Sequence, residues 1–360
     1  RWPFIKSRIN SGPIPAAHPK FREGVPVDSE NCLVSTPKST LDPPTKRTFG
    51  LSYLNFAESN LASIIDWVKI ALGTGLSFKK INKISQEIPE VKMPNKISTG
   101  LGRTTCAYFM PGDTTIIYAS THLQNAECPH VPKSSDGKYV WPIYDSYDIF
   151  VSDLDGKIVK QLTNNKGYDA EATVSPKGDK IVFTSDRSGD LELYTMNIDG
   201  SNIQQVTFGL GYDGGAFFSP NGKKLVFRSS RPVGDKEVEE YKNLLSQGLV
   251  KPTEMEIYTC NVDGSELKQI TKLGKANWAP FYHPSGEKII FSSNHKSTRG
   301  FPFNLFMINI DGSELKQITF DETFDAFPMF SYSGDKIVFS SNRNNGGTRA
   351  TNLFIADWIE

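Results

Sequence analysis

The chain has 360 residues and no net charge, because 40 Lys and Arg balance 40 Asp and Glu. With no positive excess to neutralise a phosphate backbone, nucleic acid is not expected as a partner. The most apolar window, LASIIDWVKIALGTGL, contains Asp66 and Lys69, so no transmembrane segment is expected. The 29 Gly and 22 Pro favour many short strands joined by tight turns over long helices.

The cysteines and histidines argue against a structural zinc site. None of the four cysteines forms a CxxC pair, and the five histidines are scattered. The chain begins at Arg1 without a signal peptide, so we expect a processed or trimmed form whose targeting segment has been lost.

One sequence unit recurs along the chain. Its clear copies begin with YDAEATVSPKGDKIVFTSDR at Tyr168, YDGGAFFSPNGKKLVFRSSR at Tyr212, NWAPFYHPSGEKIIFSSNH at Asn277 and FDAFPMFSYSGDKIVFSSNR at Phe324. An apolar run, a turn with Gly and an alternating run predict a hairpin, and two further runs are joined through Asp-Gly. Four antiparallel strands per unit cannot bury both faces alone, so the units are expected to stack as blades of a β-propeller.

The N-terminal part carries fainter copies. Residues 1–47 are expected to be a Pro-rich arm that ends in a closing strand, and a blade is expected at 48–97 because RTFGLSYLN from Arg47 matches VTFGLGYDG from Val206. The stretch ESNLASIIDWVKIALGTG lacks the turn and fits either a helix or a degenerate hairpin. The next blade, 98–162, aligns without a gap and places Arg103 on Tyr168.

The remaining blades are expected at 163–206, 207–270, 271–318 and 319–360. The last ends after its third strand at NLFIADWIE, so the N-terminal strand would supply the missing outer strand. Closing the ring in this way removes exposed edges, and the fold expected is an all-β, six-bladed propeller of four-stranded antiparallel blades over 48–360.

The consensus YDAxxxxSPxGxKIVFxSxR, followed by DGSxxxQIT, resembles the PD40 (WD40-like) repeat of TolB-type propellers. The resemblance is good over 98–360 and weak over 48–97, and no counterpart of the separate N-terminal α/β domain of TolB is expected in this sequence. It implies a periplasmic or exported protein without catalytic activity. It also implies binding to envelope proteins, such as peptidoglycan-associated or outer-membrane proteins. No GxSxG or HExxH hydrolase motif is present.

The long insertions all fall between the second and third strands of their blades. They lie at 122–145, 232–252, 296–302 and 344–351. Loops on one side of a rigid scaffold commonly carry function, so this face is the predicted binding surface. Within 232–252, DKEVEEYKNLLSQG has helical spacing and Gly248 as a stop, which predicts a short helix.

Acidic and basic residues recur in register on the same face. The first strands are headed by Asp169, Asp213, Asn277 and Asp325, and the second strands are followed by His122, Arg187, Arg231, His295 and Arg343. One interpretation is structural, with each Asp capping its turn and pairing with an Arg that fixes neighbouring blades. The other is a carboxylate ring at the channel mouth that binds Ca²⁺ through Asp169, Asp213 and Asp325, although Thr104 and Leu54 interrupt it.

Further candidates lie nearby. Glu171 is expected to point the same way as Asp169, two residues before it. Cys106 and Cys128 are candidates for a disulfide, with two free thiols as the alternative. Trp141, Tyr144, Tyr147 and Trp278 are candidate anchors for a protein or glycan, or residues that pack the long loop.

The function predicted is a non-catalytic binding or scaffold propeller of the bacterial envelope. The first alternative is a hydrolase or lyase acting on peptide or glycan at the channel mouth, using Asp169, Glu171, Asp213, Asp325, Arg187 and His295. A second alternative is a subunit of a larger envelope complex that is tethered by the N-terminal arm.

Overall fold

The computed structural model describes residues 96–131, 139–298, 300, 302–344 and 350–359. These residues form small antiparallel sheets, which we number as blades 1 to 5 in chain order. Blade 1 contains β1 (Thr104–Phe109), β2 (Thr115–Ser120), β4 (Asp148–Asp153) and β5 (Ile158–Gln161). Blade 2 contains β6 (Asp169–Val174), β7 (Lys180–Ser185), β8 (Glu192–Asn197) and β9 (Gln204–Gln205).

The other three blades follow the same order. Blade 3 contains β10 (Asp213–Phe218), β11 (Lys224–Ser229), β13 (Glu256–Asn261) and β14 (Lys268–Gln269). Blade 4 contains β15 (Asn277–Tyr282), β16 (Lys288–Ser293), β17 (Asn304–Asn309) and β18 (Lys316–Gln317). Blade 5 has three strands among the described residues, β19 (Asp325–Phe330), β20 (Lys336–Ser341) and β21 (Asn352–Asp357).

The predicted propeller of four-stranded blades is confirmed, but the number of blades differs. The described structure shows five blades and not six. The arm and closing strand at 1–47, and all but the last two residues of the blade expected at 48–97, lie outside the described residues. That stretch is also the one whose sequence lacks the Pro-x-Gly turn shared by most of the other units.

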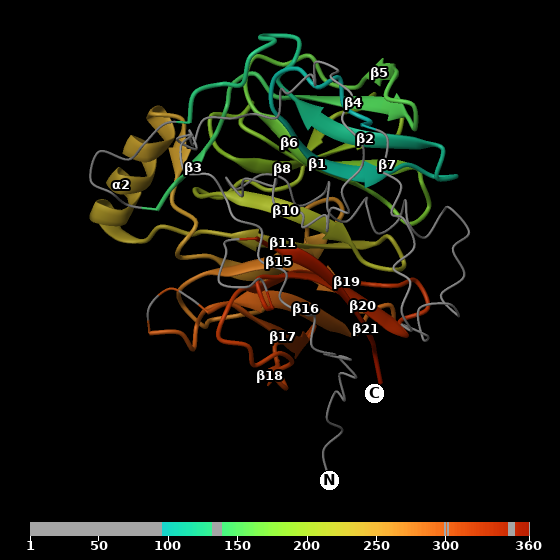
Figure 1. Cartoon of the computed structure of the whole chain (residues 1–360). Helices are drawn as coiled ribbons and strands as arrows, with labels where there is room; N and C mark the ends of the chain where they lie inside the picture. The colour runs from blue at the N-terminus through green and yellow to red at the C-terminus, as the bar shows by residue number, and fades with distance from the viewer. Residues whose placement is uncertain (1–95, 132–138, 299, 301, 345–349, 360) are drawn as a thin grey trace, which may run out of the picture.

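The blades stack through their first strands. β1, β6, β10, β15 and β19 lie side by side in that order, and Figure 1 shows blade 1 at the top and blades 4 and 5 in the lower part of the molecule. Separate apolar cores fill the spaces between neighbouring blades; one joins Ile117 of blade 1 to Phe183 of blade 2, and the next joins Val182 to Phe227 of blade 3. Burial between blades therefore holds the array together.

Strand pairing divides the molecule into two faces. Asp213 pairs with Ser229, which in turn pairs with Glu256, so the connection into the first strand and the loop between strands two and three emerge together. We call this side the loop face and the opposite side the turn face. The described residues contain no helix long and apolar enough to cross a membrane.

Two insertions on the loop face join each other. The blade 1 insertion contributes β3 (Trp141–Pro142), which pairs antiparallel with β12 (Leu249–Val250) of the blade 3 insertion. The predicted helix is confirmed as α2 (Gly234–Ser246), which buries Tyr241 and Leu244 and lies beside β3 in Figure 1. Gly248 follows it with φ +68°, a conformation that favours glycine and ends the helix.

Candidate functional site

The repeated acids and bases pair inside their own blades. Arg187 donates to both carboxylate oxygens of Asp169 at 2.9 Å, Arg231 contacts those of Asp213 at 2.6 and 2.8 Å, and Arg343 contacts Asp325. The three Asp side chains are 0% exposed. The Asp–Arg pairs were expected to fix neighbouring blades, and this was wrong. Each pair instead joins the start of the first strand to the end of the second strand of the same blade.

Blades 1 and 4 replace both members of the pair together. In blade 4, Ser293 donates to Asn277 at 2.6 Å and lies 2.9 Å from Nδ1 of His295. In blade 1, Ser120 lies 3.4 Å from Thr104 and 3.0 Å from Nδ1 of His122. Where the second strand is followed by Arg, the first strand begins with Asp, and where it is followed by His, the first strand begins with a neutral residue. This is expected of a pair that stabilises its own blade.

Neither member of these pairs is among the residues that line the central pocket. The predicted channel-mouth residues that do not line this pocket are Asp169, Asp213, Asn277, Asp325, His122, Arg187, Arg231, His295 and Arg343. The described residues hold no group of three His, Cys, Asp or Glu side chains placed to share a metal ion. The Ca²⁺ site stays a prediction.

A β-bulge in every first strand sets what does face the channel. The pairing register shifts after the second residue of each first strand, and the third residue has a positive φ in all five. These residues are Cys106, Glu171, Gly215, Ala279 and Phe327. The bulge breaks the alternation of the strand, so Glu171 turns into the channel while Asp169 stays inside its blade, contrary to the prediction.

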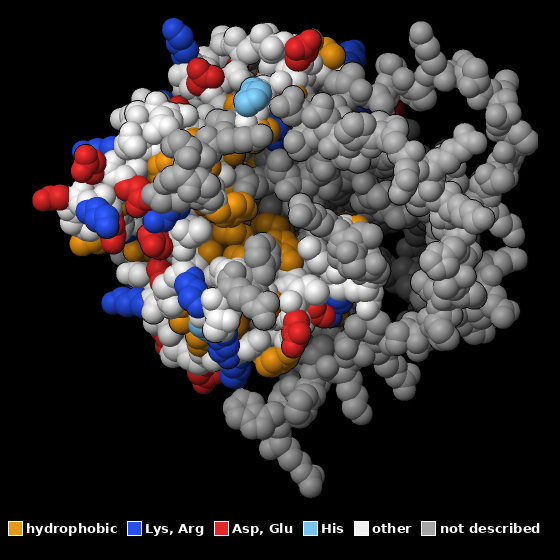
Figure 2. All heavy atoms as spheres, turned by 60° about the vertical axis from the view of Figure 1, so that its left-hand side comes forward, with side chains coloured by type: hydrophobic (Ala, Val, Ile, Leu, Met, Phe, Trp, Pro, Cys, Tyr) orange, Lys and Arg blue, Asp and Glu red, His pale blue; other side chains and the backbone are white. Residues whose placement is uncertain are grey.

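A pocket of about 410 Å³ occupies the channel, and all five bulge residues line it. Its walls are mainly apolar, and many of the lining side chains are aromatic. They include Tyr108, Tyr139, Trp141, Tyr144, Tyr147, Tyr168, Tyr212, Phe217, Trp278, Phe324 and Phe327. Figure 2, which brings the α2 side of the molecule forward, shows hydrophobic side chains gathered in a hollow of this face. A concave, mostly apolar cavity of this size is suited to a small ligand.

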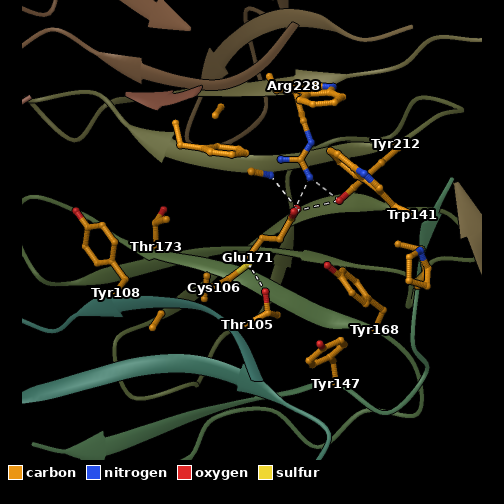
Figure 3. A pocket seen from close by; sticks show the side chains of 18 of the residues that line it. Thr105, Cys106, Tyr108, Trp141, Tyr147, Tyr168, Glu171, Thr173, Tyr212 and Arg228 are labelled. Carbon is orange, nitrogen blue, oxygen red and sulfur yellow. Dashed lines mark hydrogen bonds and ion pairs between the residues drawn. The ribbon is translucent and has the colours of Figure 1, made fainter. Parts of the chain in front are cut away.

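The polar centre of the pocket joins blades 2 and 3. Oε1 of Glu171 accepts hydrogen bonds from Nη2 of Arg228 at 2.5 Å and from the Tyr212 hydroxyl at 3.1 Å. Its Oε2 accepts from Thr184 and from the backbone N–H of Gly215, both at 2.9 Å. Figure 3 shows Glu171, Tyr212 and Arg228 pointing toward one another. Each carboxylate oxygen of Glu171 thus accepts two hydrogen bonds from its neighbours.

Two glycines make room for this network. A Cβ on Gly214 would lie 2.4 Å from Oε2 of Glu171, and one on Gly215 would lie 2.0 Å from Nη1 of Arg228. Gly215 also has φ +61°, which glycine adopts without strain. The absence of side chains at Gly214 and Gly215 therefore leaves the space that Glu171 and Arg228 occupy.

The joined insertions place Trp141 against this centre. Its ring lies 5.2 Å from the guanidinium carbon of Arg228, 5.2 Å from the ring of Trp278 and 6.4 Å from that of Tyr212. The hydroxyl of Tyr241 in α2 donates to Asp190 in the blade 2 loop, which docks the helix on that blade. Trp141, Tyr144, Tyr147 and Trp278, predicted on the loop face, all line the pocket.

The charge states at the centre follow from burial and pairing. Burial alone would raise the pKa of Glu171, but the adjacent Arg228 charge and the hydrogen bonds from Arg228, Thr184 and Gly215 hold it below its usual value. Burial also opposes the charge on Arg228, and Glu171 more than offsets this, so the pKa of Arg228 is raised. Both groups are ionised at neutral pH.

Cys106 is a free thiol in the pocket, so the predicted Cys106–Cys128 disulfide does not form. Burial and the nearby Glu171 charge raise the pKa of Cys106 to about 12. Its Sγ lies 3.1 Å from the Thr105 hydroxyl. A thiol that stays protonated at neutral pH is a poor nucleophile.

The sequence-based search missed Arg228, Tyr212 and Arg103, which line the pocket with Glu171. A signal was available for Arg228. The pairing register places Ala119, Thr184, Ser292 and Ser340 where blade 3 has Arg228. Glu171 is likewise the charged member of the five bulge residues. Both residues differ from their equivalents in the other blades, and this difference could have identified them as site residues.

Comparison with known families bears out the expected resemblance. Residues 129–251 match PD40, described as the TolB beta propeller domain. This part of the chain carries the TolB-type PD40 repeat. No curated protein was found to match the chain.

Solved structures similar to this chain include two TolB proteins. The putative TolB from Agrobacterium tumefaciens is 18% identical, with 74% of this chain and 78% of that one covered and a TM-score of 0.45. TolB from Acinetobacter baumannii is 20% identical, with 61% and 50% covered and a TM-score of 0.47. An oligogalacturonate lyase in complex with manganese is 14% identical, with 71% and 77% covered and a TM-score of 0.40.

Proposed function

We propose that this chain is a non-catalytic binding module of the bacterial cell envelope, periplasmic or exported, that engages a protein partner through its loop face. The observation that carries the proposal is a set of exposed apolar side chains on that face. Phe208 and Phe320, which follow the fourth strands of blades 2 and 4, are 74% and 75% exposed, and Val233 at the start of α2 is 76% exposed. Exposed apolar groups around a rigid, concave surface are typical of protein interfaces.

The arrangement of charged residues supports binding over catalysis. The enzyme alternative relied on Asp169, Asp213 and Asp325, and each of these is buried and paired with Arg inside its blade. Glu171 is the other acid of that alternative, and its two oxygens hold four hydrogen bonds. A general acid or base needs a proton that it can exchange with a substrate, and these groups are engaged with the fold.

The test is affinity capture from an envelope extract of the source bacterium. We expect the wild-type chain to capture a reproducible partner, and we expect the Phe208→Ser/Phe320→Ser variant to lose it. Tyr332→Ser is the matched control, because Tyr332 is 90% exposed in the turn between β19 and β20 on the opposite face. Equal loss with the control, or retention by the double variant, would contradict a loop-face interface.

A further inference from the structure

The central pocket contains an arginine whose donors are only partly used. Arg228 is 7% exposed, and the hydrogen bonds it makes within the described residues, to Glu171 and to the Tyr212 hydroxyl, both use Nη2. Its Nε is buried and has no hydrogen-bond partner among the residues that the structure describes. A buried donor that is left unpaired costs free energy, so its persistence calls for an acceptor that completes the site.

The orientation of this arginine is fixed. Its guanidinium lies 5.2 Å from the Trp141 ring and 4.9 Å from the Tyr212 ring, and Glu171 holds one edge. No side chain of another blade shares this arrangement, since the equivalent positions within the described residues are Ala, Thr and Ser. The result is a preorganised donor in a cavity of low polarity, where a charge-assisted hydrogen bond is strong.

The charge of the pocket has a definite sign. Its described lining includes three charged side chains, Arg103, Glu171 and Arg228. Glu171 and Arg228 compensate each other, whereas Arg103 has no ion pair within the described residues, and its Nε is also buried without a hydrogen-bond partner. The described lining of the pocket therefore carries one uncompensated positive charge.

The same geometry disfavours a cationic ligand. Both oxygens of Glu171, the pocket's carboxylate among the described residues, are already occupied by two donors each. The walls offer flat aromatic surfaces, such as Trp141, Trp278 and Phe327. Aromatic walls favour a flat apolar body, because rings stack in offset or edge-to-face geometry.

We propose that the central pocket binds a small monoanion with a flat apolar body, such as an aromatic carboxylate, whose acidic group accepts hydrogen bonds from Arg228 and Arg103. This site is separate from the proposed protein interface and does not depend on it. The ligand would contact Trp141 of β3, which lines the pocket.

The experiment compares three probes of one shape by isothermal titration calorimetry. They are 3-phenylpropanoate, 3-phenylpropan-1-ol and 3-phenylpropylamine, which are anionic, neutral and cationic at pH 7. We expect the acid to bind roughly tenfold more tightly than the alcohol, because a charge-assisted hydrogen bond in a buried site is worth about one decade of affinity. We expect the amine to bind most weakly.

Arg103→Gln tests the source of the preference without disturbing the buried pair. It should weaken binding of the acid roughly tenfold and leave the alcohol unchanged. Lys177→Gln, which makes the same change of charge in an exposed turn on the opposite face, should leave both probes unchanged. Absence of acid binding, equal affinity for acid and alcohol, tighter binding of the amine, or an unchanged preference in Arg103→Gln would each overturn the proposal.

Discussion

Two kinds of buried ion pair occur in this propeller, and they differ in how they relate to the repeat. The Asp–Arg pair recurs in blades 2, 3 and 5 and is replaced as a unit by neutral partners in blades 1 and 4. The Glu171–Arg228 pair occurs once among the described residues, joins two blades and lines the pocket. The repeated Asp–Arg pairs hold each blade together, whereas the Glu171–Arg228 pair, which departs from the repeat, forms part of the candidate site.

The largest effect is expected from breaking the pair that does not repeat. Arg228→Met leaves the Glu171 carboxylate buried without its cation and should lower the free energy of unfolding by about 4 kcal/mol. Adding Glu171→Gln removes the stranded charge, so the double variant should be at least about 2 kcal/mol more stable than the sum of the single losses predicts. Urea unfolding of the four proteins measures this coupling, and additive losses would contradict it.

Breaking a repeated pair should lower the free energy of unfolding by less than breaking the Glu171–Arg228 pair, because Arg231 keeps 23% of its side chain in solvent. Asp213→Asn should lower the free energy of unfolding by about 2–3 kcal/mol. Adding Arg231→His copies the partners found in blade 4 and should restore part of that loss. Both variants should keep the preference for an anionic probe, because neither Asp213 nor Arg231 lines the pocket. Loss of that preference in Asp213→Asn would erase the distinction between the two kinds of pair.

The smallest effect concerns Glu192, at the head of the third strand of blade 2 beside the repeated pair. Burial, with the charges of Asp213 and Asp190, raises its pKa to about 8. Between the ordinary pKa of Glu and about 8, the folded state binds the proton more tightly than the unfolded state, so stability falls as pH rises through this window.

Glu192→Gln cannot titrate and should escape this loss. Relative to wild type, it should gain unfolding free energy as the pH rises from 5 to 9. Urea unfolding at the two pH values measures the gain. A difference between the two proteins that does not change with pH would show that Glu192 is ionised at little cost in the folded state.

The repeats explain how far the fold could be predicted. Strand order, the position of each insertion and helix α2 all follow from patterns within one unit, such as the Ser-Pro-x-Gly turn at Ser175 and the helical spacing around Tyr241. The sixth blade was predicted from a faint copy at 48–97, which lies outside the described residues. Local sequence patterns determine the strands and turns of each unit, and stacking of similar units then gives the propeller.

The site was harder to predict, because alternation is a poor guide at a bulge. Asp169 and Glu171 stand two residues apart and were expected to face the same way, yet the αL conformation of Glu171 sends one into the blade and the other into the pocket. The Cys106–Cys128 bridge was inferred because the start of a first strand and the long insertion of the same blade were expected to meet, and Cys106 instead lies as a free thiol in the pocket.

The sequence by itself determined a propeller of repeated antiparallel blades, because turns and alternating runs are read within about 44 residues at a time. It also contained the signs of the site, since Glu171, Gly214, Gly215 and Arg228 depart from their equivalents in the other blades. Only the tertiary structure showed that these four residues meet. The contact runs between neighbouring blades and through a bulge, and no spacing along the chain encodes either.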